Sequence, residues 1–356
     1  MPIVPIAQAQ PVTPGGGFDY VTVDAARRRV YAAHGGGGGL LIADADTGNV
    51  LGIVPVGPMH GVAVDPATGH VFTGNGTNRS VSEVDPETKS ILRTVAVDGP
   101  VDAIAYDPDL GRIYADEDNG TRIFAIDSTT FKPIATVNLP GHKPEYIQVD
   151  PATHDVYQNI ATDDPAVSQI AVVDSKTLTV SRSIATPILV SDHPLQYDAA
   201  DRALLVAGEN GVLAVYGRSG ALAHRVPFAG QVDQCSWDAM RRWLACAGGG
   251  LTLYAYDGTS DPRLLATLKI APGLHTTAID PKTGTVWAVW NDRTTGAAWL
   301  QGFTYQTLIY GAGDGLGAAL EQSAALDMTA FAASFSRVAV ASIVQCSASI
   351  NRVTGL

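Results

Sequence analysis

Seven residues that can bind a metal ion or transfer a proton recur along the chain at nearly regular intervals. They are Asp19, His60, Asp102, Glu145, His193, Asp233 and His275. Carboxylates and imidazoles bind divalent transition metals, and both also serve as general acids and bases. The chain has 35 acidic residues and 8 histidines among its 356 residues, so a random position holds one of these types only about one time in eight. Seven such positions in a row indicate a shared role.

Each of these residues lies five positions before an aspartate that ends a short alternating stretch, as in "VAVDPAT" and "AIAYDPD". We call these the marker aspartates: Asp24, Asp65, Asp107, Asp150, Asp198, Asp238 and Asp280. Successive markers are 40 to 48 residues apart, close to the period of about 40–45 residues of four-stranded propeller blades. The sequence therefore predicts seven copies of one repeat.

Each repeat has the pattern of four short strands. An alternating strand is followed by an Asp-led turn such as "DPATG", and then by strands such as "RIYADE", "TRIFAID" and "ILRTVAV". Alternation bounded by turn residues predicts strands, and an aspartate begins a turn by accepting backbone hydrogen bonds, so the marker aspartates are predicted to be structural. The predicted fold is all-β: a seven-bladed β-propeller of four-stranded antiparallel blades over residues 1–306.

The seventh repeat contains only three clear strands, and the segment "VPIAQAQPV" before the first repeat is predicted to supply the fourth. This N-terminal strand closes the ring and so removes exposed sheet edges. Residues 307–356 lack the repeat. They are predicted to form a C-terminal tail, helical or disordered, with no function assigned.

Repeats of the form "VDPATGHVFTGNGTNRSVSEVDPETKSILRTVAV" resemble the YVTN family of β-propeller repeats, which occur on secreted and surface proteins of prokaryotes. The resemblance extends from about residue 10 to residue 306. It implies a seven-bladed scaffold that hosts many different roles, so the activity must be inferred from the site.

Two features bear on the compartment. The triplet Ala7-Gln8-Ala9 resembles the end of a secretory signal, although the same residues also suit an ordinary first strand. Cys235 and Cys246 are nearly opposite in the expected hairpin, where they form either a disulfide, if the protein is exported, or two buried thiols. The sequence favours a periplasmic or secreted protein.

Composition excludes several classes of partner. The net charge of −12 argues against nucleic acid, since phosphate binding requires a basic surface. No run of 18 apolar residues is present, so no membrane span is predicted. The chain is predicted to act as a monomer.

In a propeller the first strand of each blade lines the central channel, so the seven residues are predicted to surround one mouth of it. A cation there would offset the repulsion between their charges. We predict that His60, His193 and His275 bind one divalent transition metal ion of open identity. Glu145, with Asp102 or Asp233, would act as general base or complete the coordination. The alternative is a solvated ring that binds nothing.

The second strand of each blade returns to the same mouth, where His34, Asn75 and Glu117 are further candidates. Gly35–Gly39 follow His34 and would allow a ligand to approach the backbone closely. Trp290, Asp292 and Arg293 occupy the matching loop of the seventh repeat, where an aromatic ring and a guanidinium would hold a sugar or a carboxylate.

No Gly-x-Ser-x-Gly, His-Glu-x-x-His or Cys-x-x-Cys motif is present. The sequence therefore favours a metal-dependent enzyme, a hydrolase, lyase or oxidoreductase, that acts on a small-molecule or saccharide-like substrate at the channel mouth. The alternative is a non-catalytic secreted or periplasmic binding or scaffold propeller.

Overall fold

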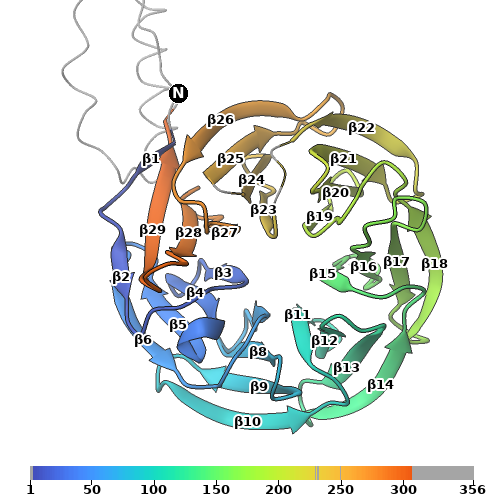
Figure 1. Ribbon diagram of the computed structural model, residues 1–356. Coiled ribbons are helices and arrows are strands. Elements are labelled where there is room, and N and C mark those ends of the chain that lie inside the picture. The colour runs from blue at the N-terminus through green and yellow to red at the C-terminus, as the bar shows by residue number, and fades with distance from the viewer. Residues whose placement is uncertain (1–2, 229, 231, 249, 307–356) are drawn as a thin grey trace, which may run out of the picture. The chain divides into compact units, whose positions relative to one another are not determined.

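A computed structural model describes residues 3–228, 230, 232–248 and 250–306. In this range the regular structure consists of 29 strands and one short 3₁₀ helix, η1 (Gly35–Gly37). The strands form seven antiparallel sheets arranged as a ring (Figure 1). The prediction of an all-β, seven-bladed propeller is confirmed. The predicted tail, residues 307–356, lies outside the described residues.

Each of the first six blades consists of four consecutive strands, ordered from the channel outward (Figure 1). Blades 1 and 2 contain β3 (Val21–Asp24), β4 (Arg29–His34), β5 (Gly39–Asp44) and β6 (Val50–Val54), then β7 (Val62–Val64), β8 (Val71–Asn75), β9 (Ser80–Asp85) and β10 (Ser90–Ala96). Blades 3 and 4 contain β11 (Val101–Asp107), β12 (Arg112–Glu117), β13 (Arg122–Asp127) and β14 (Lys132–Asn138), then β15 (Pro144–Val149), β16 (Val156–Ile160), β17 (Gln169–Asp174) and β18 (Thr179–Ala185). Blades 5 and 6 contain β19 (Leu195–Asp198), β20 (Ala203–Gly208), β21 (Val212–Gly217) and β22 (Leu222–Pro227), then β23 (Cys235–Asp238), β24 (Trp243–Ala247), β25 (Gly250–Ala255) and β26 (Arg263–Lys269).

The seventh blade joins the two ends of the propeller. It contains β27 (Thr276–Ile279), β28 (Val286–Asn291) and β29 (Ala298–Tyr305), and both β1 (Ile3–Pro5) and β2 (Gln10–Val12) pair with β29. Residues 6–9 stand opposite only two residues of β29, Gln301 and Gly302, so the closing strand is interrupted by a bulge. The predicted closure by the N-terminal segment is confirmed, with two short strands in place of one.

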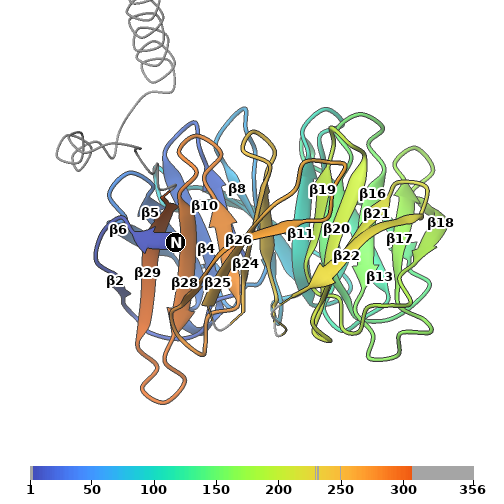
Figure 2. The ribbon, with the colours of Figure 1, turned by 90° about the horizontal axis from the view of Figure 1, so that it is seen from above.

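Apolar side chains fill the space between neighbouring sheets. One buried cluster, for example, combines Tyr157 and Ile170 of blade 4 with Leu204 and Val206 of blade 5. The strands run roughly along the channel axis, so that the connecting turns lie at the two ends of the ring (Figure 2). This packing fixes which end of each innermost strand faces which mouth of the channel.

The marker aspartates close the turns that follow the innermost strands. Each accepts a hydrogen bond from the backbone N–H two residues later, as Asp150 does from Ala152 at 2.9 Å. Several also bind a cationic side chain of a neighbouring blade, as Asp280 binds Arg28 at 2.6 Å. The structural role predicted for these aspartates is confirmed.

In the part of the chain that the structure describes, no helix has the length and apolar character needed to cross a bilayer.

Replacing Asp280 by Ala tests whether these contacts stabilise the ring. The substitution removes an acceptor from the Lys282 N–H and the Thr283 hydroxyl and leaves Arg28 with Asp46 as its carboxylate partner. Because Asp280 is fully buried, we expect the free energy of unfolding to fall by about 1–3 kcal/mol in urea denaturation.

Asp46→Ala is the matched control, since it removes the other carboxylate from the same arginine. The Asp46 side chain is 59% exposed, and loss of an exposed ion pair costs less than about 1 kcal/mol. Equal losses in the two variants would contradict a special role for the buried marker aspartate.

Candidate functional site

The seven predicted residues lie at the starts of the innermost strands. Asp102 and Glu145 are the second residues of β11 and β15, and the other five lie just before β3, β7, β19, β23 and β27. The marker aspartates lie at the other ends of the same strands. The seven residues therefore surround one mouth of the channel, and we call them the mouth ring. All are half-buried except Asp102, which is buried.

Asp19, His60 and Asp102, from blades 1, 2 and 3, form the first compact group. His60 Nδ1 lies 2.6 Å from Asp19 Oδ2 and 3.7 Å from Asp102 Oδ1. One ligand atom from each of the three residues lies within 4.8 Å of the other two. This spacing suits one nitrogen and two oxygen ligands of a single divalent ion.

Glu145, His193 and Asp233 form a second group with the same spacing. His193 Nε2 lies 3.3 Å from Glu145 Oε1. Here a lysine is already present, because Lys143 Nζ lies 3.6 Å from Glu145 Oε1 and 3.4 Å from His193 Nε2. An ammonium group therefore offsets part of the negative charge of this group.

Sequence analysis missed Lys143 because the comparison of repeats considered only acidic and imidazole side chains. Lys143 lies seven positions before its marker aspartate. The same position in the other repeats holds no charged residue: Gly17, Pro58, Pro100, Ser191, Gln231 and Gly273. Lys143 could therefore have been found from the sequence as the one charged residue at this repeat position.

His275 belongs to neither compact group. Its Nδ1 lies 2.9 Å from the carbonyl oxygen of Gly273, and its Nε2 lies 3.1 Å from that of Phe18 and 3.7 Å from Asp233 Oδ2. The three imidazoles are thus each held beside a different carboxylate of the mouth ring, and they do not gather into one compact group of ligands. This arrangement differs from the one expected from the sequence, in which all three face one ion.

Three residues form a floor beneath the mouth ring: Tyr20, Tyr146 and Gln234. The Tyr20 hydroxyl donates a hydrogen bond to the Glu145 carbonyl, which joins blade 1 to blade 4. Gln234 Nε2 donates to the Tyr146 hydroxyl at 3.2 Å and to the Val21 carbonyl at 2.9 Å. We call these residues the channel floor. All three lie four positions before their marker aspartates, directly after a mouth-ring residue, and sequence analysis missed them because it compared only acidic and imidazole side chains.

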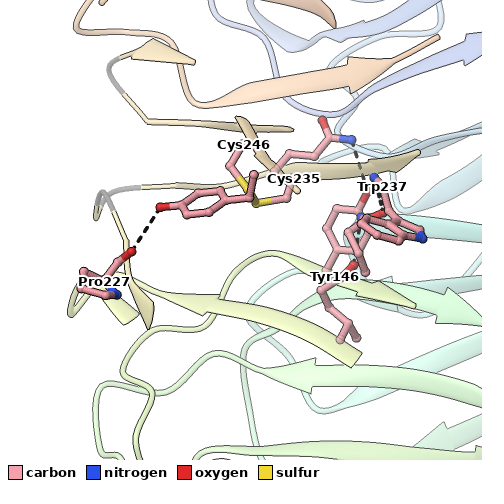
Figure 3. Close-up of a disulfide and its surroundings, with 9 residues drawn as sticks. Tyr146, Pro227, Cys235, Trp237 and Cys246 are labelled. Carbon is pink, nitrogen blue, oxygen red and sulfur yellow. Dashed lines mark hydrogen bonds between the residues drawn. A yellow bond between two sulfur atoms is a disulfide. The ribbon is translucent and has the colours of Figure 1, made fainter. Parts of the chain in front are cut away.

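A disulfide bond lies directly beside the channel floor. Cys235 and Cys246 pair in register across β23 and β24, and their sulfur atoms are bonded (Figure 3). Cys235 follows Gln234 in the chain, so the bond links the strand that carries this floor residue to its neighbour. Of the two states that the sequence left open, the structure has the disulfide.

Two other predicted mouth residues are bound to their own blades. Both carboxylate oxygens of Glu117 accept hydrogen bonds from Arg122, which lowers the pKa of Glu117. Asn75 is buried and donates to the hydroxyls of Ser80 and Ser82. Their interactions are those of structural residues.

The remaining predicted mouth residues are His34, Trp290, Asp292 and Arg293. His34 is fully buried, its ring stacks on Phe18 with centroids 4.3 Å apart, and burial lowers its pKa. Trp290 is buried against Trp299, and Asp292 accepts backbone hydrogen bonds within its own loop. Arg293 is exposed.

Four residues of the mouth ring have a raised pKa. Burial, followed by repulsion from Asp19, raises the pKa of Asp233 to about 7. Burial and four neighbouring carboxylates also raise the pKa of Asp102. The hydrogen bond to Asp19 raises the pKa of His60, and Glu145 raises that of His193 despite the opposing effect of burial.

These shifts predict that the metal-free protein becomes less stable as the pH rises from about 5 to about 8. A carboxyl or imidazole whose folded-state pKa exceeds its unfolded-state value binds more protons in the folded state, so deprotonation favours unfolding. Urea denaturation in the presence of a chelator would measure the slope, and Asp233→Asn should make it shallower. A free energy of unfolding that increases across this range would contradict the assignment.

Comparison with known proteins identifies the fold of the chain but neither its family nor its activity. No protein-family model and no curated protein sequence matches the chain. Similar solved structures include hydrazine synthase of Kuenenia stuttgartiensis, with a TM-score of 0.70 and 16% identity over 81% of this chain and 96% of that one. They also include a chain of the mitotic checkpoint complex (TM-score 0.71, 12% identity, 85% and 93% covered) and the β-propeller domain of Myceliophteria thermophila Cps50 (0.65, 14%, 84% and 99%). At these identities the likeness shows a β-propeller fold alone.

Proposed function

We propose that Asp19, His60 and Asp102 bind one divalent transition metal ion and that the chain is a metal-dependent enzyme with its site at this mouth of the channel. The observation that carries the proposal is the spacing of the three side chains, whose ligand atoms lie within 4.8 Å of one another. One imidazole and two carboxylates leave coordination positions for water or substrate.

The local charge favours metal binding by the first group over metal binding by Glu145, His193 and Asp233. Among the described residues, no lysine or arginine forms an ion pair with Asp19 or Asp102, whereas Lys143 lies beside Glu145 and His193. In the described part of the chain, two carboxylates and an imidazole therefore face one another in the first group without a lysine or arginine beside them. A divalent ion would offset this repulsion and favour the ionised form of Asp102.

The second group supplies the acid–base residues of the proposal. Asp233, with a pKa of about 7, gains and loses a proton near neutral pH, as a general acid or base must. Glu145 and His193 lie beside it with 3.3 Å between Oε1 and Nε2, and Lys143 would stabilise negative charge on a bound substrate. A metal ion in the first group would polarise a substrate oxygen or activate water. These parts suit a hydrolase, a lyase or an oxidoreductase acting on a small polar or saccharide-like substrate.

We also propose that the chain is related to the YVTN-repeat propellers and works in the periplasm or outside the cell. The repeat pattern supports the first statement. The disulfide between Cys235 and Cys246 supports the second, because such bonds persist mainly in oxidising compartments.

Metal stoichiometry and affinity test the proposed site. Wild-type protein titrated with Zn²⁺ or Mn²⁺ should bind one ion, and His60→Ala should lower the affinity at least about tenfold while keeping the circular dichroism spectrum. Affinity should fall as the pH falls, because protons compete for the carboxylates.

Lys143→Met provides the sharpest contrast, since it removes the ammonium group from the second set of ligands. This variant should bind two ions, the second of them lost again on adding Glu145→Gln. A wild-type protein that binds no ion, or that binds it equally well without His60, would contradict the site.

Turnover tests the enzymatic part of the proposal. Metal-loaded protein would be assayed with uronides, lactones and phenols, with Asp233→Asn as the variant expected to lose activity while retaining the ion. Stoichiometric metal without turnover by the wild type would favour a non-catalytic binding propeller.

A further inference from the structure

A cavity of about 300 Å³ lies on the other side of the channel floor from the mouth ring. It is lined by residues of the innermost strands β3, β7, β11 and β15, together with all three floor residues. Its volume is at the lower end of the range of about 300–1,000 Å³ that ligand pockets occupy. The cavity can hold a small molecule.

The walls of this cavity are strand edges. Each innermost strand pairs with only one neighbour, so alternate residues direct their backbone N–H and C=O groups towards the channel. In blade 2 the Asp65 N–H donates to the His70 carbonyl, and the Gly74 N–H donates to the Gly61 carbonyl. Gly61 and Asp65 thus direct these backbone groups towards β8, and the backbone groups of the alternate residues Val62 and Val64 face the channel. The cavity therefore presents rows of backbone donors and acceptors.

One such edge already binds an amide. The Val21 N–H donates to Gln234 Oε1 at 3.0 Å, and the Val21 carbonyl accepts from Gln234 Nε2 at 2.9 Å. The side-chain amide of blade 6 thus makes, on the edge of blade 1, the pair of hydrogen bonds that a neighbouring strand would make. This contact shows that the channel edges accommodate a planar amide that offers a donor and an acceptor together.

The lining residues also limit the charge of a ligand. Those that the structure describes carry no charged side chain, and the carboxylates of the mouth ring lie just beyond the floor. An anion would be repelled, and a strongly charged group of either sign would lose hydration without a partner. The Tyr146 hydroxyl accepts from Gln234 and keeps its own proton to donate.

We propose that this channel cavity is a second ligand site, separate from the mouth ring, and that it binds a small uncharged molecule through an amide edge. The ligand takes the same pair of hydrogen bonds on β7, β11 or β15 that Gln234 takes on β3. This site does not depend on metal binding at the mouth.

Binding of the cyclic dipeptide cyclo(Gly-Gly) tests the proposal. This probe is uncharged, small and has two amide edges, whereas 1,4-cyclohexanedione has the same ring size and carbonyl groups but no N–H donors. In ligand-observed NMR the cyclic dipeptide should bind at least tenfold more tightly than the dione and than zwitterionic glycylglycine. Equal binding of the dione would overturn amide recognition, and no binding of the cyclic dipeptide would overturn the site.

Two variants place the probe in the cavity. Thr22→Phe and Gln148→Trp add bulk from opposite walls, and neither residue belongs to an apolar core cluster. Each should weaken binding at least tenfold, whereas Thr22→Ser should not, and thermal melts would identify whichever variant fails to fold. His60→Ala should leave binding of the cyclic dipeptide unchanged, so the failure of the metal site and the failure of this site are distinguishable. Binding that survives in both folded bulky variants would place the probe elsewhere and overturn the proposal.

Discussion

The turn that each marker aspartate closes is the constraint on which the rest of the molecule depends. The carboxylate accepts backbone N–H groups of its own turn, and in several blades it also binds an arginine or histidine of the next blade. Because the innermost strands are short, fixing one end at one face of the ring fixes the other end at the opposite face. A residue five positions before the aspartate therefore reaches the channel mouth, once in each blade. The mouth ring is a geometric consequence of repeating one turn seven times.

That repetition brings four carboxylates together at one channel mouth, where they repel one another more strongly than they would if spread over the surface. Around one channel, burial and the mutual repulsion of Asp19, Asp102, Glu145 and Asp233 raise the pKa of Asp102 and Asp233. The protein offsets this repulsion unevenly. Lys143 offsets part of the negative charge on one side of the mouth, while no lysine or arginine among the described residues forms an ion pair on the side containing Asp19, His60 and Asp102. An imperfection in the repeat, a lysine at one position of seven, thus divides a nearly symmetric ring into two chemically different halves.

The sequence was sufficient for the fold and for the positions of the mouth ring, because both follow from a local turn and a constant offset. It was not sufficient for the orientation of the side chains. Whether His275 faces an ion or the carbonyl of Phe18 depends on residues 257 positions apart, and no pattern within one repeat encodes that contact. The channel floor is a different case. Tyr20, Tyr146 and Gln234 all lie four positions before their marker aspartates, so the offset could have located them, but their hydrogen bonds join different repeats and are not encoded within any one repeat.

The channel floor adds contacts between blades that are not neighbours. Most contacts in a ring of blades join adjacent blades. The hydrogen bond of Tyr20 instead connects blade 1 with blade 4 across the channel, and those of Gln234 connect blade 6 with blade 1 and blade 4. Tyr20 binds the backbone of Glu145, and Gln234 lies between Asp233 and the disulfide-bonded Cys235. These hydrogen bonds and the disulfide hold the floor residues in place between the mouth ring and the channel cavity, so the two sites are expected to bind their ligands independently.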